Sequence, residues 1–312
     1  MTERRFDDRV AVITGAGRGL GREYALLLAS RGAKVVVNDL GGSMAGDGAD
    51  AGPAETVVKE IRAAGGDAVA STDSVATFDG GKAIIQKAID AYGRVDVLIH
   101  NAGNVRYGSL DSIDPADFHA VVDVHLIGAF NVVRNAFPHM LKAGYGRVVL
   151  TSSIGGLYSI PNGLPYAVSK SGMIGINNVI ALEGAAHGIR SNIILPGAVT
   201  RMAEGLDTSL YPPMGADLVA PVVAWLAHES CSVSGELYTS MAGRVARAFI
   251  AESQGVYRPS WTIDDVAEQI ERIRDTGRLP EKTWLLPPLP SGFGDHLARS
   301  FEMARSGAVN RN

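Results

Sequence analysis

The sequence predicts an α/β fold, with a doubly wound, seven-stranded parallel sheet followed by a C-terminal extension. Short segments rich in β-branched residues alternate with longer helical stretches, which is typical of βαβ units. The interiors of the expected strands, such as VAVIT and KVVVND, are continuous apolar runs, as in strands covered by helices on both faces. With 312 residues and 46% hydrophobic side chains, the chain can bury the core of one large domain.

The elements follow from these patterns in chain order. Strands are expected at Val10–Thr14, Lys34–Asp39, Ala68–Ser71, Val95–Asn101, Arg147–Ser152, Arg190–Leu195 and Leu237–Met241. Helices are expected at Arg22–Arg31, Ala54–Ala64, Gly80–Tyr92, Pro115–Lys142, Tyr166–Ala186 and Ala216–His228. A change in composition after Gly243 divides the chain into a sheet domain, residues 1–243, and an extension, residues 244–312, packed on the same domain.

The extension and one loop have distinct patterns. Thr262–Arg274 is expected to form an amphipathic helix capped at Thr262, and the Pro-rich stretch after it to be irregular. The loop Leu40–Gly52 has thirteen residues, mostly Gly, Ala and Asp. This is long for a strand-to-helix connection, so the loop is either functional or mobile.

Composition narrows the classes of partner. The net charge is −4 and the chain has no Lys/Arg cluster that would hold a phosphate backbone, so a small molecule is expected and nucleic acid is not. The charged N-terminus and the lack of a long apolar run favour a soluble, cytoplasmic protein without a membrane partner. Cys231 is the only cysteine, which favours a small buried side chain and argues against a disulfide or a metal site.

A glycine-rich turn follows the first strand directly and opens the first helix. Glycines here allow a tight turn, close approach of backbone N–H groups to a pyrophosphate, and close helix–strand packing, as in Rossmann-type folds. A single such turn is weak evidence, because glycines are common at strand-to-helix junctions. The candidate phosphate-binding residues in this turn are Gly15, Arg18, Gly19, Leu20 and Gly21.

Asp39 ends the second strand, where a carboxylate accepts hydrogen bonds from an adenosine ribose. A 2′-phosphate at that place would be repelled by the carboxylate, so Asp39 favours NAD over NADP. Arg18 is the opposing observation, because a cation there could pair with a 2′-phosphate.

Two further strand ends fit a dinucleotide. Asp73, Ser74 and Val75 follow the third strand, within reach of an adenine amino group. Asn101, Ala102 and Gly103 follow the fourth strand and leave room through their small size. Each is ordinary turn chemistry by itself, and their position at successive strand ends favours a binding site.

Tyr166 and Lys170 lie four residues apart at the start of a predicted helix, so both project from one face. Lowering the pKa of a phenol from about 10 to about 7 requires roughly 4 kcal/mol, which an ammonium about 4 Å away supplies at an effective dielectric of about 20. Ser153, after the fifth strand, could hydrogen-bond the substrate oxygen. Tyr166 would then exchange a proton with an alcohol while hydride moves to or from a nicotinamide. The alternative is a surface Tyr–Lys pair, because this spacing often arises by chance.

Together these motifs resemble the classical short-chain dehydrogenase/reductase family: TGxxxGxG at Thr14–Gly21, NAG at Asn101–Gly103, Ser153, YxxxK from Tyr166, and PGAVT from Pro196. The resemblance implies catalysis by Ser153, Tyr166 and Lys170, with Lys170 also on the nicotinamide ribose. It implies a homodimer or homotetramer. It also assigns a set of residues to the nicotinamide end of NAD: Pro196, Gly197, Val199 and Thr200.

One position departs from the classical pattern. His125 stands where the family has an asparagine that joins a proton relay, and it is either a relay residue or a packed core histidine. With the Gly-rich loop and WLAHESC, His125 makes the chain similar to the (3R)-hydroxyacyl-CoA dehydrogenase part of type 2 peroxisomal multifunctional enzymes.

That similarity implies NAD-dependent oxidation of a (3R)-3-hydroxyacyl-CoA. The alternatives are a 17β-hydroxysteroid or steroid side-chain acyl-CoA substrate and, from another class, a non-catalytic NAD(H)-binding regulator. Apolar residues near Arg201–Gly215 could line either an acyl or a steroid pocket, namely Met202, Leu206, Leu210, Tyr211 and Met214.

Overall fold

The computed structural model describes residues 3–159, 161–200, 213–275 and 283–285. The chain divides into two compact units, Met1–Arg247 and Ala248–Asn312. The division lies after Arg247, whereas composition placed it after Gly243. The packing of the extension on the sheet domain stays a prediction.

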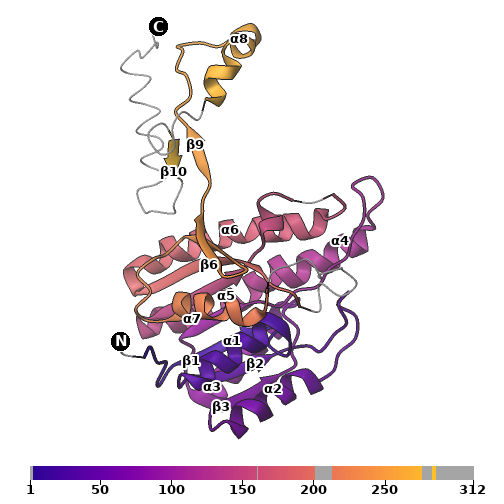
Figure 1. The fold of residues 1–312 in the computed structure, drawn as a ribbon, viewed down its shortest axis with the longest axis vertical. Helices are drawn as coiled ribbons and strands as arrows, with labels where there is room; N and C mark the ends of the chain where they lie inside the picture. Colours follow the sequence, from indigo (N-terminus) through magenta and orange to yellow (C-terminus); the bar gives the residue numbers. More distant parts are fainter. Residues whose placement is uncertain (1–2, 160, 201–212, 276–282, 286–312) are drawn as a thin grey trace. The chain divides into compact units, whose positions relative to one another are not determined.

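The first unit is built on an eight-stranded sheet in the order β3-β2-β1-β4-β5-β6-β7-β8. Figure 1 labels β1, β2, β3 and β6 of this sheet among the helices that surround it. Strands β1 to β7 pair in parallel, and the order reverses between β1 and β4, as the doubly wound fold requires. Their bounds are β1 Val10–Thr14, β2 Lys34–Asn38, β3 Asp67–Ser71, β4 Val97–His100, β5 Gly146–Thr151, β6 Ile189–Gly197 and β7 Leu237–Met241. The predicted parallel sheet is therefore confirmed.

The predicted number of strands was wrong by one. The strand β8, Arg244–Ala248, follows β7 after a two-residue turn and adds to the sheet edge. Ala242 and Gly243 both have positive φ, 48° and 78°, as a tight hairpin turn requires. The sequence concealed this hairpin because Ala-Gly is a weak turn signal and RVARA, with two arginines in five residues, does not resemble a strand.

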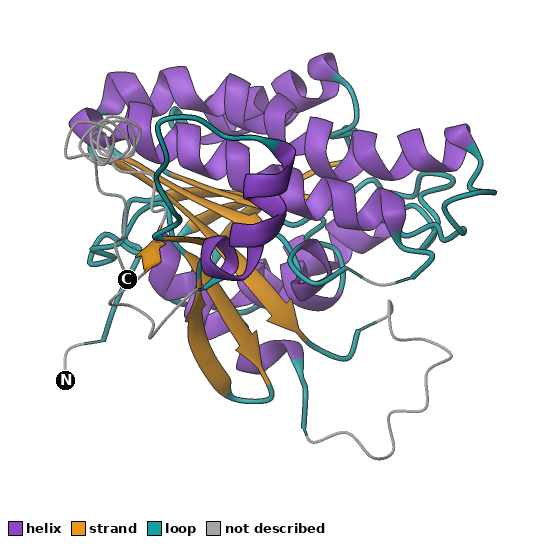
Figure 2. Ribbon diagram, turned by 90° about the horizontal axis from the view of Figure 1, so that it is seen from above, coloured by secondary structure: helices purple, strands orange, loops and turns teal. Residues whose placement is uncertain are grey.

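Helices cover both faces of the sheet (Figure 2). On one face α1 packs against α2 and α7, and on the other α3 and α6 pack against α5. The core of the first face joins alternate residues of β1 and β2 with Tyr24, Leu28 and Ile61 of the helices. The helices are α1 Gly19–Ser30, α2 Gly52–Ala63, α3 Phe78–Tyr92, α4 Pro115–Val122, α5 Gly128–Ala143, α6 Leu164–Gly184 and α7 Ala220–Ala227.

The single helix expected over Pro115–Lys142 is interrupted. A π-helical turn at Asp123–Ile127 separates α4 from α5, and π-turns often occur at functional sites. By length and composition alone, Pro115–Ala143 is apolar enough to cross a membrane. Its packing against α3, α6, β4 and β5 is that of a helix covering the sheet.

The second unit, within its described residues, contains α8 Ile263–Arg274 and an antiparallel pair, β9 Ala251–Ser253 with β10 Thr283–Leu285. The predicted cap of α8 is confirmed, because Thr262 and Asp265 form a capping box. Thr283–Leu285 lies in the stretch expected to be irregular, so that expectation was wrong there. This strand pairs with β9, which is distant in the sequence, with Trp284 opposite Glu252.

Candidate active site

A cleft of about 300 Å³ lies at the carboxyl ends of the parallel strands. Doubly wound sheets bind ligands at this edge, next to the point where the strand order reverses. Most of the residues predicted from the sequence line it: Gly15, Arg18, Gly19, Leu20, Asp39, Asp73, Ser74, Val75, Asn101, Ala102, Gly103, His125, Tyr166, Lys170, Pro196 and Thr200.

Four predicted residues are not among those lining the cleft, namely Gly21, Ser153, Gly197 and Val199. Gly21 packs beneath the glycine turn, where a Cβ would stand 2.2 Å from the Gly15 oxygen. A Cβ at Gly197 would stand 2.4 Å from Met241, so this residue also serves close packing. Sequence reasoning missed other lining residues: Asn38, Leu40, Gly42, Ser43, Gly46, Asn104, Val124, Thr151, Ser152 and Ala198.

The glycine turn approaches the backbone after β4 closely. Gly15 has φ +63°, and a Cβ there would stand 2.7 Å from Ala102 Cα. The Asn101 amide donates to the Gly15 oxygen at 3.0 Å. The side chain of Thr14 accepts backbone N–H groups from both Asn101 and Ala102 at 3.1 Å. The segments that follow β1 and β4 are therefore held together as one surface.

Asp39 is fixed by backbone donors. One carboxylate oxygen accepts from Gly17 N and the other from Gly41 N, each at 2.8 Å. Each oxygen keeps a second lone pair for a ribose hydroxyl. Arg18 points instead to the Gly42 oxygen, 3.4 Å from its guanidinium.

The loop Leu40–Gly52 is folded against the segment after β4. Val105 N donates to the Met44 oxygen at 3.1 Å, and Arg106 donates to the Ala45 oxygen at 3.0 Å. Arg106 also pairs with Asp47 of the loop at 2.8 Å and with Asp117 of α4 at 2.6 Å. Because this loop contributes to the lining of the cleft, Arg106 anchors one wall of the site.

Tyr166 and Lys170 extend from the start of α6. Lys170 is buried and donates to the Thr151 oxygen at 2.6 Å, and its Nζ lies 5.4 Å from the centre of the Tyr166 ring. The Ser153 hydroxyl accepts from Gly155 N at 3.0 Å. A hydrogen bond from Ser153 also lowers the pKa of Tyr166, so these three side chains form one group.

The expected lowering of the Tyr166 pKa was wrong. Burial raises the pKa of Tyr166 above its ordinary value, and the hydrogen bond to Ser153 opposes this only in part. Burial likewise lowers the pKa of Lys170 to about 7. Desolvation penalises the charged form of each group, so proximity alone does not yield a phenolate here.

His125 belongs to the same group. It is buried in the π-turn, and its ring meets that of Tyr166 edge-on, with centroids 5.4 Å apart. Its Nε2 lies 2.7 Å from the oxygen and 3.1 Å from the nitrogen of Asn104. Its Nδ1 is buried without a hydrogen-bond partner among the described residues, as is Thr151 Oγ1. Burial lowers the pKa of His125 well below its usual value, so the ring is neutral.

Part of the predicted substrate loop lies outside the described residues, namely Met202, Leu206, Leu210 and Tyr211. Of that set the structure describes Met214, whose oxygen accepts from Val199 N at 2.7 Å.

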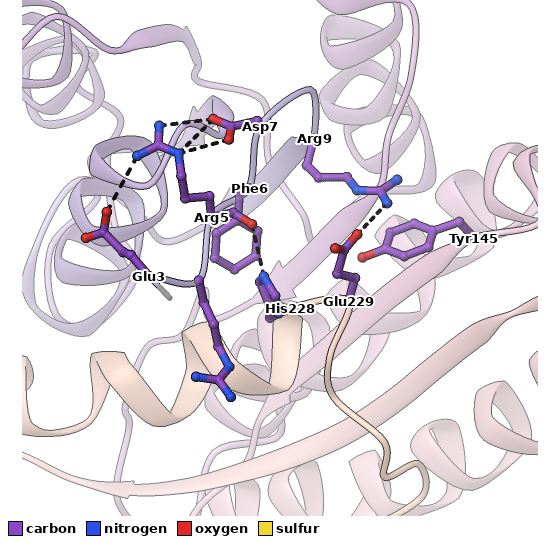
Figure 3. Close-up of a pocket in the computed structure, with 9 residues that line it drawn as sticks. Glu3, Arg5, Phe6, Asp7, Arg9, Tyr145, His228 and Glu229 are labelled. Carbon is purple, nitrogen blue, oxygen red and sulfur yellow. Dashed lines mark hydrogen bonds and ion pairs between the residues drawn. The ribbon is translucent and has the colours of Figure 1, made fainter. Parts of the chain in front are cut away.

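A larger cleft of about 610 Å³ is lined by the segment before β1, Tyr145 before β5, and His228 and Glu229 directly after α7 (Figure 3). Charged side chains there pair with one another: Arg5 with Glu3 and Asp7, and Arg9 with Glu229. Parallel strands place this cleft at the opposite edge of the sheet from Tyr166, so we assign the chemistry to the smaller cleft. In the described part of the chain no three His, Cys, Asp or Glu residues gather to hold a metal.

The fold and this site define a class of enzyme. The short chain dehydrogenase family matches residues 9–209, and the chain belongs to this family of oxidoreductases.

Particular relatives agree with the resemblance found in the sequence. The chain is 45% identical over 314 residues to the peroxisomal multifunctional enzyme type 2 of Drosophila melanogaster, covering 96% of this chain and 52% of the relative. It is 43% identical over 270 residues to a short-chain type dehydrogenase/reductase of Mycobacterium tuberculosis, covering 86% of this chain and 94% of that protein. The chain thus spans about half the length of the Drosophila relative.

Solved structures give the same fold. The full-length Drosophila enzyme aligns with a TM-score of 0.77 and 37% identity, covering 96% of this chain and 50% of that one. A short chain dehydrogenase from Mycobacterium avium aligns with a TM-score of 0.76 and 34% identity, covering 88% and 98%.

Proposed function

We propose that the protein is an NAD-dependent dehydrogenase that oxidises a (3R)-3-hydroxyacyl-CoA to the 3-ketone. The observation that carries the reaction type is the group formed by Ser153, Tyr166 and Lys170 at the carboxyl edge of the sheet. The relatives named multifunctional enzyme type 2 support the acyl-CoA substrate, and Asp39 supports NAD.

The residues of the cleft fit a dinucleotide. A Cβ at Gly15 or Gly17 would fill the space at the glycine turn, at 2.7 Å from Ala102 Cα or 2.8 Å from Asp39 Oδ2. The backbone N–H groups at the start of α1 suit a pyrophosphate, and Asp39 suits a ribose without a 2′-phosphate. A dinucleotide held by these residues would supply the acceptor for the hydride of the carbinol carbon.

The protein's own groups then handle the proton. Ser153 donates a hydrogen bond to the substrate oxygen and holds it beside Tyr166. Tyr166 takes the hydroxyl proton as general base. Lys170 supplies positive charge to the developing phenolate, although burial keeps part of this lysine neutral near pH 7.

His125 completes the group as a neutral residue that holds a water. Its Nε2 has both a donor, Asn104 N, and an acceptor, Asn104 O, within reach, so either tautomer is satisfied at that nitrogen. Nδ1 can therefore accept or donate a hydrogen bond without the ring becoming charged. A carboxamide has the same dual capacity, which explains how a histidine fits the position of the family's asparagine.

A rate comparison tests the proposal: NAD and NADP with (3R)- and (3S)-3-hydroxyacyl-CoA thioesters and with 17β-hydroxysteroids. We expect the highest kcat/KM with NAD and a (3R)-thioester. A kcat/KM for a free hydroxysteroid that matches the thioester would replace the proposed substrate by the steroid alternative. NADH binding without turnover of any alcohol would support the non-catalytic regulator instead.

Two further predictions from the sequence remain part of this proposal. A cytoplasmic location would appear in fractionation of the native host. A homodimer or homotetramer would appear in the mass of the purified protein in solution.

A further inference from the structure

We propose that His100 is a positioning residue: the buried imidazole at the end of β4 holds the π-turn that carries His125 and thereby sets the direction of the His125 ring. This inference rests on the proposed function, in which neutral His125 holds a water beside Tyr166. His100 is fully buried, contributes to none of the predicted motifs, and is not among the residues that line the cleft.

The hydrogen bonds of His100 fix its tautomer. Thr14 Oγ1 accepts two backbone N–H groups, from Asn101 and Ala102, which occupy both of its lone pairs. Its one proton is therefore donated to His100 Nδ1, 3.0 Å away. His100 must then carry its own proton on Nε2, which donates to the backbone oxygen of His125 at 3.0 Å.

The acceptor of that bond is the backbone of the π-turn. In a π-turn the backbone hydrogen bonds shift by one residue relative to the α-helices on either side, so carbonyls are available to partners outside the helix. His100 also packs tightly against the start of α5, where a Cβ at Gly128 would stand 3.3 Å from His100 Cε1. The imidazole therefore joins the end of β1 to the π-turn and has little space to move.

His125 is consequently held at two points. His100 holds its backbone oxygen, and Asn104 holds its ring through Nε2. Gly103 leaves the space for that ring, since a Cβ there would stand 2.4 Å from His125 Cε1. With both points fixed, the edge of the ring lies against Tyr166. Loss of the backbone anchor would leave Asn104 alone to orient it.

His100 acts through hydrogen bonds and not as a proton carrier. Burial, with Lys170 nearby, lowers its pKa to about 3, so the ring is neutral at any pH at which the enzyme would work. A glutamine can make both bonds, because its Nε2 donates to the His125 oxygen and its Oε1 accepts from Thr14. A leucine of similar volume makes neither.

A double-mutant cycle in the full chain tests the proposal. We expect His100→Leu to lower kcat about 10- to 100-fold, the range that a small misplacement near the chemistry costs. His100→Gln should stay within about 3-fold of the wild type, because it restores both bonds. His187→Gln, at an exposed histidine, is the matched control.

The second arm uses His125→Phe, which keeps a ring beside Tyr166 but has no nitrogen. In that background we expect His100→Leu to lower kcat by less than about 2-fold, because its effect passes through His125. An equal loss in both backgrounds would overturn the role of His100 and leave the proposed function intact. Full kcat in His125→Phe alone would instead overturn the proposed role of His125.

A measurement on the wild type remains decisive if His100→Leu does not fold. Nitrogen NMR of the histidine rings should find His100 with its proton on Nε2 between pH 5 and 9. A proton on Nδ1, or titration in that range, would contradict the arrangement. A folded His100→Gln with as large a loss as any active-site variant would contradict it as well.

Discussion

The two ends of the cleft are built in opposite ways. The proposed nucleotide end consists mainly of backbone: Gly15 and Gly17 leave space that a Cβ would fill, and the N–H groups of Gly17 and Gly41 hold the Asp39 carboxylate. The proton end consists of buried side chains, with Lys170, His125 and His100 all almost completely enclosed. The geometry of the nucleotide end therefore depends on glycines without a Cβ and on the charge of Asp39. The geometry of the proton end depends on the hydrogen bonds and the protonation states of its buried side chains.

The largest effect is expected at the proton end. Tyr166→Phe removes the only proposed acid–base group and should lower kcat by about 1,000-fold. The dissociation constant of NADH should change by less than about 2-fold, because the nucleotide end is untouched. Stopped-flow rates and fluorescence titration measure the two quantities. Tyr158→Phe, at a tyrosine that is 83% exposed, is the control.

At the nucleotide end, Asp39→Ala should shift preference from NAD toward NADP. Removing a charge about 5 Å from a 2′-phosphate is worth a factor of about 10 to 100 at an effective dielectric between that of water and about 20. The measurement is the ratio of kcat/KM for the two nucleotides. Asp50→Ala, in the loop that follows Asp39 but outside the cleft lining, should leave the ratio unchanged. An unchanged ratio in Asp39→Ala would mean that another residue selects between NAD and NADP.

The same contrast explains what the sequence could predict. The nucleotide end follows from local patterns, because glycine turns and strand-end acids have fixed spacing, and the residues at Gly15 and Asp39 lie where expected. The proton end depends on desolvation, which no spacing reveals, so the pKa of Tyr166 moved opposite to expectation. The strand β8 and the π-turn at His125 were missed because the local sequence at each is equally compatible with other conformations. The backbone hydrogen bonds that distinguish the observed conformation form only in the folded chain.

Burial at the proton end should appear as a dependence of stability on pH. The pKa of Lys170 is lowered from 10.5 to about 7, so between these values the unfolded chain binds more protons than the folded one. The free energy of unfolding should therefore rise from pH 7 to about 9, below the range in which tyrosines ionise. Urea unfolding at several pH values measures this. Lys170→Met should flatten the rise, whereas Lys87→Met, on the exposed face of α3, should not.

Replacing a glycine of the cleft or its adjacent loop by alanine should lower the free energy of unfolding, and the loss should be larger where the new Cβ meets nearby atoms. Gly15→Ala combines positive φ with a contact of 2.7 Å to backbone, and we expect a loss of about 2 to 3 kcal/mol. Gly48→Ala has φ +80° but nothing within 4 Å, so only the conformational cost of about 1 kcal/mol applies. Chemical denaturation measures both. Equal losses would mean that the turn relaxes to accept a side chain.

The smallest effect concerns the loop Leu40–Gly52, which the sequence left as either functional or mobile. Arg106 lies at the boundary of the two ends, since it holds Ala45 and Asp47 of the loop and follows Asn104, which orients His125. Arg106→Leu should weaken NADH binding about 3-fold, as expected for partly exposed ion pairs, and higher salt should shrink the difference. Arg5→Leu, which removes comparable pairs at the opposite edge, should do neither. If Arg106→Leu lowers kcat more than it weakens NADH binding, the loop acts on the proton end through Asn104, and the two ends are not independent.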